Sequence, residues 1–366
     1  MIKTNYLSLL VLISAGLVIA TNNSSLKVEN QTRNDVYTAP SPPSITPIPK
    51  IKLKIPPQQK ILVNPYHIFQ TFNNCGPASL SMALSYYKIS EDQQVLGKYL
   101  RPYQNPQGDN DDKSVTLEEL ADMAKNYKLI PYHRPNGTID TLKLFVTYDI
   151  PVITRTLTKV NEDIGHYRVV KGFDDDTNDI IQDDSLQGKN LRYSYANFNA
   201  LWKAYNYEYL VLVPSDKQEF AEAILGEDLD LITAWRKAAE NSQQELITNP
   251  DDIYLRFNLS VALYNIGDHQ KSVKEFEKVE HLLPFRTLWY QIEPILAYYE
   301  LGNYQRVFEI TDNILNNQNR AFSELYLIRG KIYLKQENIT AAREEFENAY
   351  FYNVNLQEAK DALDSL

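Results

Sequence analysis

The stretch that decides the fold is Gln70–Ser79, QTFNNCGPAS, which contains Cys75, the one cysteine of the 366-residue chain. Gly76 and Pro77 favour a tight turn followed by a helix start, because proline fits the first helical turn. The pattern of Ala78–Tyr87 is helical, so Cys75 is expected at a helix N-terminus. Unpaired backbone N–H groups there favour the nucleophilic thiolate. The stretch predicts a catalytic cysteine, whereas a lone cysteine without this context is more often a small buried apolar residue.

Three further features support a catalytic role for this cysteine. Gln70 precedes it by five residues and is expected to donate a side-chain N–H to an oxyanion. His166 follows far downstream in the segment GHYRVVKGF, and the acids Asp183 and Asp184 follow that histidine. Glutamine, cysteine, histidine and aspartate thus occur in the chain order of papain-like cysteine hydrolases.

Through these motifs, residues 60 to 214 resemble the C39-like peptidase family. The resemblance implies an α+β papain-like cysteine hydrolase domain, in which an N-terminal helix packs against an antiparallel sheet. It also implies that Cys75 is the nucleophile, that His166 is its base and that an aspartate at 183 or 184 orients the histidine. The family acid commonly precedes a proline, and Ser185 stands in that position here, which favours Asp184. Because side chains alternate along a strand, Asp183 is then expected to face solvent.

Local patterns place the remaining elements of this domain. Thr116 and Glu119 fit a capping box, which predicts that a helix opens at Thr116. Apolar and β-branched runs predict strands at Ile150–Leu157 and Tyr209–Val213, and a hairpin around the turn Asp174–Asp179.

The other histidines and the acidic loops do not suggest a second site. His67 lies upstream of the cysteine and His133 in an expected loop, so both are interpreted as structural or solvated. The loops Asp109–Asp112 and Asp174–Asp179 lack the ligands of a calcium-binding EF-hand. No zinc-type histidine or cysteine spacing occurs, and no cofactor is implied.

The N-terminal segment indicates export. Residues 1–20 combine Lys3 with an apolar run from Tyr6 to Ala20 that ends in small residues, which is typical of a secretory signal peptide. An uncleaved segment that anchors the protein to a membrane is the alternative. Residues 21–60 are rich in proline, asparagine and serine and are expected to form an extended linker.

The C-terminal region, residues 217–366, has a helical pattern that repeats. Similar turn sequences are centred on Gly267, Gly302 and Glu337, so they recur every 35 residues. This period resembles that of tetratricopeptide repeats, and the region is expected to be an all-α array of three repeats with a leading helix pair. Pro294 is expected to interrupt the first helix of the middle repeat. The array is expected either to pack on the catalytic domain or to bind a protein partner.

Taken together, these patterns predict that residues 61–214 form the catalytic domain of an exported cysteine peptidase, or a related amide hydrolase, that acts on a peptide or protein substrate. Acyl transfer to an amine would use the same residues. The alternative is a non-catalytic module that grips peptides on a papain-like scaffold. The net charge of −10 argues against nucleic acid as a partner, because phosphate binding needs a basic surface.

Overall fold

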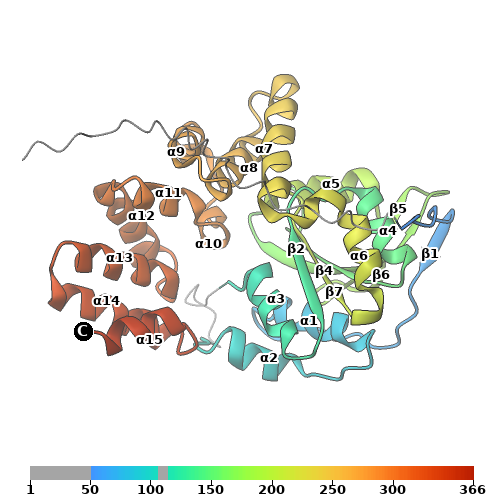
Figure 1. Cartoon of the computed structure of the whole chain (residues 1–366), viewed down its shortest axis with the longest axis horizontal. Helices are drawn as coiled ribbons and strands as arrows, with labels where there is room; N and C mark the ends of the chain where they lie inside the picture. Colours follow the sequence, from blue (N-terminus) through green and yellow to red (C-terminus); the bar gives the residue numbers. More distant parts are fainter. Residues whose placement is uncertain (1–50, 106–113) are drawn as a thin grey trace, which may run out of the picture. The chain divides into compact units, whose positions relative to one another are not determined.

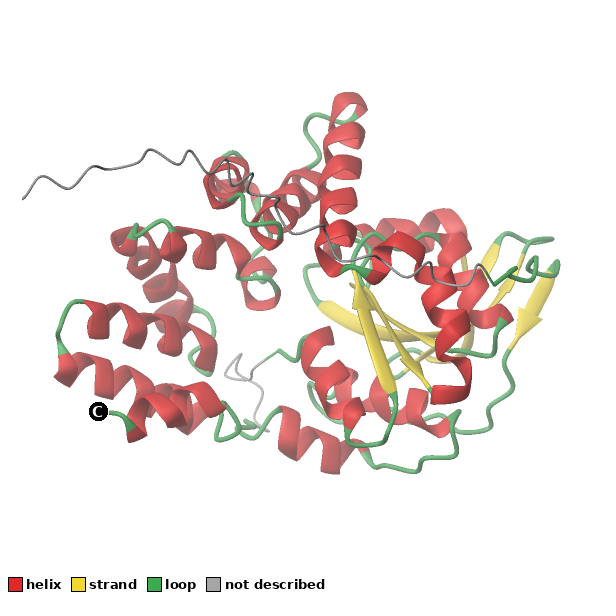
Figure 2. Cartoon of the chain, viewed as in Figure 1, coloured by secondary structure: helices red, strands yellow, loops and turns green. Residues whose placement is uncertain are grey.

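The computed structural model describes residues 51–105 and 114–366 (Figures 1 and 2). The expected signal peptide, most of the expected linker and the acidic segment Asp109–Asp112 lie outside the described residues. Within the described ranges, no helix is long and apolar enough to cross a membrane. The described part of the chain consists of a sheet domain, from residue 51 to residue 229, and a helical region, from residue 231 to residue 366.

The sheet domain contains one seven-stranded antiparallel sheet with the order β2-β7-β3-β4-β5-β6, and β1 also pairs with β4. The strands are β1 (Gln59–Ile61), β2 (Ile130–Arg134), β3 (Val152–Leu157), β4 (Gly165–Asp174), β5 (Asp179–Asp184), β6 (Gly188–Ser194) and β7 (Tyr209–Val213). The predicted hairpin is confirmed as β4 and β5, and the last predicted strand is confirmed as β7.

Both faces of the sheet are covered by helices. The first face carries α1 (Cys75–Ser85), α2 (Gln93–Leu100) and α3 (Leu117–Lys125). The second carries α4 (Ile139–Thr147), α5 (Tyr195–Trp202) and α6 (Gln218–Leu225). The short 3₁₀ turns of this domain are η1 (Lys203–Tyr205), η2 (Ser215–Lys217) and η3 (Gly226–Leu229).

The two-residue period of the strands explains this three-layer arrangement. Val169 of β4 packs with α1 to α3, whereas its neighbour Val170 packs with α4 to α6. Leu210 and Val211 of β7 divide between the two faces in the same way. A strand that is buried on both faces has a continuous run of apolar residues, which is why these strands could be recognised in the sequence.

Two helix predictions are refined by the structure. Helix α3 begins after Thr116, whose hydroxyl accepts from the Glu119 backbone N–H while the Glu119 carboxylate accepts from the Thr116 backbone N–H, so the capping box is confirmed. Helix α1 begins at Cys75 itself and ends at Ser85, so the expected range Ala78–Tyr87 was shifted towards the C-terminus.

The sheet domain extends beyond the predicted range at both of its ends. Gln59 and Lys60, assigned to the linker, instead form strand β1 beside the end of β4. Helix α6, assigned to the repeat region, instead packs on the sheet through Ala221 and Leu225. Short segments such as β1 carry too few residues for a periodic signal, so their pairing depends on tertiary contacts.

The helical region consists of successive helices joined by short turns. They are α7 (Leu231–Thr248), α8 (Ile253–Asn265), α9 (His269–Glu277), η4 (Glu280–Leu282), α10 (Thr287–Tyr290), α11 (Glu293–Glu300), α12 (Tyr304–Asn317), α13 (Ser323–Lys335), α14 (Ile339–Tyr352) and α15 (Gln357–Asp364). Pro294 lies in the first turn of α11, and the one-turn helix α10 ends shortly before it. The proline thus stands at the start of a helix and not in its interior.

The three similar turn sequences occupy equivalent places between paired helices. Gly267, Gly302 and Glu337 lie between α8 and α9, α11 and α12, and α13 and α14, and their φ angles are 82°, 72° and 59°. A positive φ is easily adopted by glycine and is unusual for glutamate, which explains why glycine occupies two of the three positions.

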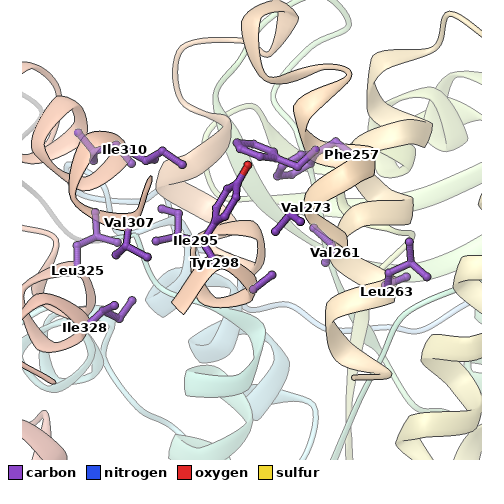
Figure 3. Close-up of a cluster of buried hydrophobic side chains, with 14 of the residues drawn as sticks. Phe257, Val261, Leu263, Val273, Ile295, Tyr298, Val307, Ile310, Leu325 and Ile328 are labelled. Atoms are coloured by element: carbon purple, nitrogen blue, oxygen red, sulfur yellow. The ribbon is translucent and has the colours of Figure 1, made fainter. Parts of the chain in front are cut away.

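Apolar side chains from α7 to α13 form one core cluster in this region, and a second cluster joins α13, α14 and α15 (Figure 3 shows the first). Phe257 and Val261 of α8 face Ile295 and Tyr298 of α11, and Val307 of α12 extends the same cluster. A helix pair cannot bury its apolar face alone, so the packing of each pair on the next provides the stability.

The helical region also contacts the sheet domain directly. Arg286 Nη1 lies 2.7 Å from Asp163 Oδ1 in an ion pair between the two parts. Asn258 Nδ2 donates to the carbonyl oxygen of Lys203 at 2.6 Å. The ion pair brings the start of α10 to the end of the sheet where β4 begins, and the hydrogen bond joins α8 to η1.

Candidate active site

Cys75 is the first residue of α1 and is half-buried. The loop before it is held by side chains of α2. Gln93 accepts from the Thr71 backbone N–H at 2.9 Å and donates to the Phe69 carbonyl at 2.8 Å. Arg101, which follows α2, donates to Asn74 Oδ1 at 2.7 Å. These bonds fix the loop and so determine where the thiol points.

His166, near the start of β4, lies between Cys75 and Asp184. Its Nε2 is 2.8 Å from Asp184 Oδ1, and its ring is close enough to the Cys75 thiol for each group to shift the pKa of the other. Because Nε2 is engaged by the carboxylate, Nδ1 is the nitrogen left to face sulfur. The side chains of His166 and Asp184 are 2% and 0% exposed, so bulk water does not screen their interaction.

Asp184 is fixed by further partners that the sequence analysis did not identify. Arg168 Nε lies 3.0 Å from Asp184 Oδ2, and Oδ1 accepts backbone N–H groups of Leu186 and Gln187 at 2.7 and 2.9 Å. Arg168 is also held by the carbonyl oxygens at the end of β3. A usable signal was present, because Arg168 follows His166 by two residues and therefore shares its face of the strand.

Asp183 faces a different buried cation. Its carboxylate oxygens lie 2.8 Å from Lys171 Nζ, and the residue is only 1% exposed. The expectation that Asp183 faces solvent was therefore wrong. The opposite face of β5 is itself covered, so a charged residue there needed a buried partner.

The electrostatics of the site favour a charged cysteine–histidine pair. Burial opposes ionisation of Cys75, but the hydrogen bond and charge of His166, the charge of Arg101 and the Gly76 backbone N–H together lower the pKa of the thiol. Burial likewise opposes protonation of His166, but the hydrogen bonds to Asp184 and Cys75 raise the pKa of the imidazole. Both pKa values therefore shift in the direction opposite to the one that burial alone would cause.

Asp184 is ionised in this setting. Burial alone would raise its pKa, but the hydrogen bond from His166, the charges of His166 and Arg168 and the Gln187 backbone N–H lower the pKa to about 2.

Gln70 lies beside the acid and is oriented by its neighbour. Ser185 Oγ donates to Gln70 Oε1 at 2.8 Å, while the Gln70 backbone N–H donates to the Ser185 carbonyl at 2.8 Å. Because the amide oxygen accepts from serine, the Gln70 amide N–H groups remain available as donors. Ser185, expected only as a stand-in for proline, thus has a direct role in placing Gln70.

The other two histidines considered in the sequence lie elsewhere. His67 Nε2 is 3.0 Å from the backbone carbonyl oxygen of Asp184, so it helps to hold the backbone of this residue in place. His133 lies in strand β2, and the expectation of a loop was wrong. Its Nε2 is 2.8 Å from Glu208 Oε2, away from Cys75. Mixed polar residues and Pro131 hid this strand from a pattern-based prediction.

A cavity of about 250 Å³ opens beside Cys75. The sheet domain supplies most of its wall, and α10 of the helical region with the residue before it supplies the rest. The lining residues are Phe72, Asn73, Cys75, Gly76, Ser114, Val115, Arg155, Ile164, Gly165, Tyr167, Arg286, Trp289 and Tyr290. In the described part of the chain, no group of three or more His, Cys, Asp or Glu side chains is placed to hold a metal ion.

Residues 52–210 match the sequence model of the Peptidase_C39 like family, so this part of the chain is a C39-like peptidase domain. The predicted family is thereby confirmed for the sheet domain. A search of the curated proteins finds no match.

Several solved structures are similar to the chain. A Bacillus anthracis protein assigned as a C39-like peptidase has 18% identity and a TM-score of 0.36, over 42% of this chain and 97% of that chain. The peptidase domain of Streptococcus ComA, a bi-functional ABC transporter involved in a quorum sensing pathway, has 20% identity and a TM-score of 0.32, over 40% and 97%. A double glycine motif protease from an AMS/PCAT transporter, in complex with the leader peptide, has 19% identity and a TM-score of 0.33, over 42% and 94%.

Proposed function

We propose that the protein is a cysteine peptidase, or a related amide hydrolase, which acts through Cys75, His166 and Asp184. The observation that carries the proposal is the position of His166, which lies beside the Cys75 thiol and hydrogen-bonds with a buried, ionised Asp184. This arrangement occurs within a C39-like domain and beside a cavity of about 250 Å³. A nucleophile, a base and a group that orients the base are the parts that covalent catalysis requires.

In the first half of the reaction, the Cys75 thiolate attacks the carbonyl carbon of the substrate amide. The carbonyl π-electron pair moves to oxygen, where the Gln70 side-chain amide and the Cys75 backbone N–H stabilise the negative charge. Protonated His166 then gives its Nδ1 proton to the departing amine as the carbon–nitrogen bond breaks. An acyl-enzyme and a free amine result.

In the second half, His166 takes a proton from water, and the resulting hydroxide adds to the thioester carbon. The carbon–sulfur bond breaks, which releases the acid and restores the thiolate and protonated histidine. Asp184 stays ionised throughout, because it holds the imidazole in one orientation and stabilises its charged form.

The test is cleavage of a mixed peptide library by the purified protein, followed by mass spectrometry. Cys75→Ser is expected to abolish cleavage while the circular dichroism spectrum stays unchanged. His166→Ala is expected to do the same, whereas His133→Ala serves as a matched control and keeps its activity. Cleavage by Cys75→Ser at the wild-type rate would contradict the cysteine mechanism. Peptide binding without any cleavage would support a binding module instead.

The helical region is proposed to be a tetratricopeptide-like array. The 35-residue recurrence of turns at Gly267, Gly302 and Glu337, and the apolar packing between successive helices, support this assignment. Such an array presents a surface to a protein partner, and here it also packs against the catalytic domain. Expression of residues 231–366 alone, with pull-down from the culture medium and the cell envelope, tests for a partner.

The protein is proposed to act outside the cytoplasm, on the strength of Lys3 and the apolar run from Tyr6 to Ala20. N-terminal sequencing of the native protein tests this proposal. A chain that starts near Thr21 is expected, and a cytosolic pool that retains Met1 or Ile2 would contradict export.

A further inference from the structure

Arg155 of β3 is a buried cation inside a group of tyrosine rings. The residue is 3% exposed. Its guanidinium carbon lies 4.8 Å from the ring centre of Tyr205, 5.4 Å from that of Tyr290 and 5.9 Å from that of Tyr167. The faces of aromatic rings stabilise a cation but accept no strong hydrogen bond.

The guanidinium of Arg155 makes no ion pair and donates no hydrogen bond to any part of the chain that the structure describes. Glu208 and Glu293 act on Arg155 through the longer-range electrostatic field, and neither carboxylate makes an ion pair with it. Arginine carries five N–H donors and stays charged at any accessible pH. A buried charge whose donors are left without acceptors is uncommon in a folded protein.

The position of Arg155 indicates where an acceptor would come from. Its side chain lines the same cavity as Cys75, and Tyr167 and Tyr290 line that cavity as well. Cys75 and Arg155 both interact electrostatically with Tyr167 and Tyr290, so the nucleophile and the cation share these two neighbours. Gly165 leaves no room for a side chain here, because an added Cβ would lie 2.7 Å from the Tyr205 hydroxyl.

The second arginine of the cavity differs in this respect. Arg286 also lines it, but Asp163 satisfies its charge at 2.7 Å. Elsewhere in the sheet domain, Arg168 is neutralised by Asp184. Arg155 is therefore the arginine of the cavity whose guanidinium makes no ion pair within the described part of the chain.

We propose that Arg155 binds a carboxylate of the substrate, so that this site selects peptides that carry a carboxylate close to the scissile bond. The planar guanidinium fork matches the two oxygens of a carboxylate. The carboxylate is supplied either by an acidic side chain or by a free peptide C-terminus. Tyr290 of α10 completes the wall around Arg155, so the helical region contributes to substrate selection. This inference rests on the proposed peptidase function of the same site.

Two series of alkylating reagents test the site without requiring cleavage. Bromoacetate, 3-bromopropionate and 5-bromopentanoate are compared with the corresponding amides, and the mass of the intact protein reports the rate. Cys75 is the single cysteine of the chain, so each thiol adduct is at the site. For at least one chain length, the acid-to-amide rate ratio is expected to exceed that of free cysteine by about tenfold or more, because the carboxylate reaches Arg155.

Variants separate Arg155 from the charge of His166. Arg155→Met is expected to bring the ratio close to that of free cysteine, whereas Arg155→Lys keeps the charge and retains part of the preference. Arg192→Met removes one positive charge from the surface of the same domain, at a side chain that is 43% exposed, and should keep the wild-type ratio. Equal ratios for the wild type and Arg155→Met at every chain length would overturn the proposal, as would equal ratios for Arg155→Met and Arg155→Lys.

Peptides then distinguish the source of the carboxylate. Calorimetry with Cys75→Ala compares peptides that differ only by internal Glu or Gln, and peptides that end in a free acid or an amide. One of the two pairs is expected to show about 100-fold tighter binding of the acid. Acid-selective binding without cleavage by the wild type would refute the peptidase function and leave the carboxylate site standing. Cleavage with no acid preference in either pair would refute the carboxylate site alone.

Discussion

The sheet domain and the helical region differ in how many charged side chains they bury. The core of the helical region is mainly apolar. Within its described length, its buried charged groups are Glu345, which is 8% exposed and pairs with Arg329 at 2.8 Å, and the Oε2 atom of Glu293. The sheet domain instead buries a set of charged or titratable side chains around its β3–β4–β5 strands and the cysteine loop. They are Arg101, Arg155, His166, Arg168, Lys171, Asp174, Asp183, Asp184 and Glu208.

Desolvating a charge is costly, and a buried ion pair often stabilises a protein no more than an apolar pair would. The described helical region builds its core with far fewer such groups than the sheet domain. Their concentration in the sheet domain therefore supports the proposal that this domain carries the catalytic site, because perturbed titratable groups tend to cluster at active sites.

The largest expected effect is on catalysis, at Asp184. Asp184→Asn keeps the shape of the side chain but removes the charge that stabilises protonated His166. We expect kcat to fall by about 10³-fold or more, because the imidazole loses its orienting partner. Steady-state rates on a peptide substrate measure this effect. Asp183→Asn is the matched control, and a larger loss of kcat in that variant would show that the two aspartates have the opposite roles.

The next effect is on stability, at the Lys171–Asp183 pair. Lys171→Met leaves the Asp183 carboxylate buried without its partner, so we expect the free energy of unfolding to fall by about 3–5 kcal/mol. Urea denaturation measures the change. The double variant Lys171→Met/Asp183→Leu should recover most of the loss. In the helical region, Glu345→Gln should cost less, about 1 kcal/mol. Equal costs in the two regions would remove the contrast between them.

A smaller catalytic effect is expected at Gln70. Gln70→Ala removes a proposed oxyanion donor, so kcat should fall by about 10²-fold with little change in KM. Ser185→Ala leaves the glutamine in place but frees its amide to rotate, and should cost only a few-fold in kcat. Stopped-time assays with one substrate compare the two variants. An unchanged kcat in Gln70→Ala would exclude this donor.

The smallest effect is a pH-dependent part of stability from Asp184. Its pKa is lowered to about 2 in the folded protein from 3.8. The contribution is therefore complete above the unfolded pKa and is lost as the pH falls through the folded pKa. We expect it to amount to about 2.5 kcal/mol, lost between about pH 4 and pH 2, since one pKa unit corresponds to about 1.4 kcal/mol. Denaturation of the wild type and Asp184→Asn over this range measures it, and parallel curves would refute it.

The sequence predicted the elements whose signals are local. The helix start at Cys75, the capping box at Thr116 and the β4–β5 hairpin each depend on neighbouring residues. Strand alternation also separated Asp183 from Asp184, although it could not say what covers the second face.

The features that escaped prediction depend on contacts between distant segments. The pairing of Asp183 with Lys171 crosses a hairpin whose register shifts between Val170 and Gly172, so residue counting cannot establish it. The tyrosine rings around Arg155 come from β4, η1 and α10, which are widely separated in the sequence. Nothing in the composition of the C-terminal region indicated that α10 would line the cavity beside Cys75.

The most direct test of the central claim is the pH dependence of Cys75 alkylation by iodoacetamide, a neutral reagent. The lowered thiol pKa and the raised imidazole pKa predict that the high-pH rate persists well below pH 8.5, the usual pKa of a thiol. In His166→Ala the midpoint should rise, and the rate at low pH should fall about tenfold for every pH unit by which the midpoint rises. A wild-type profile with its midpoint near pH 8.5, unchanged in His166→Ala, would contradict an activated cysteine at this site.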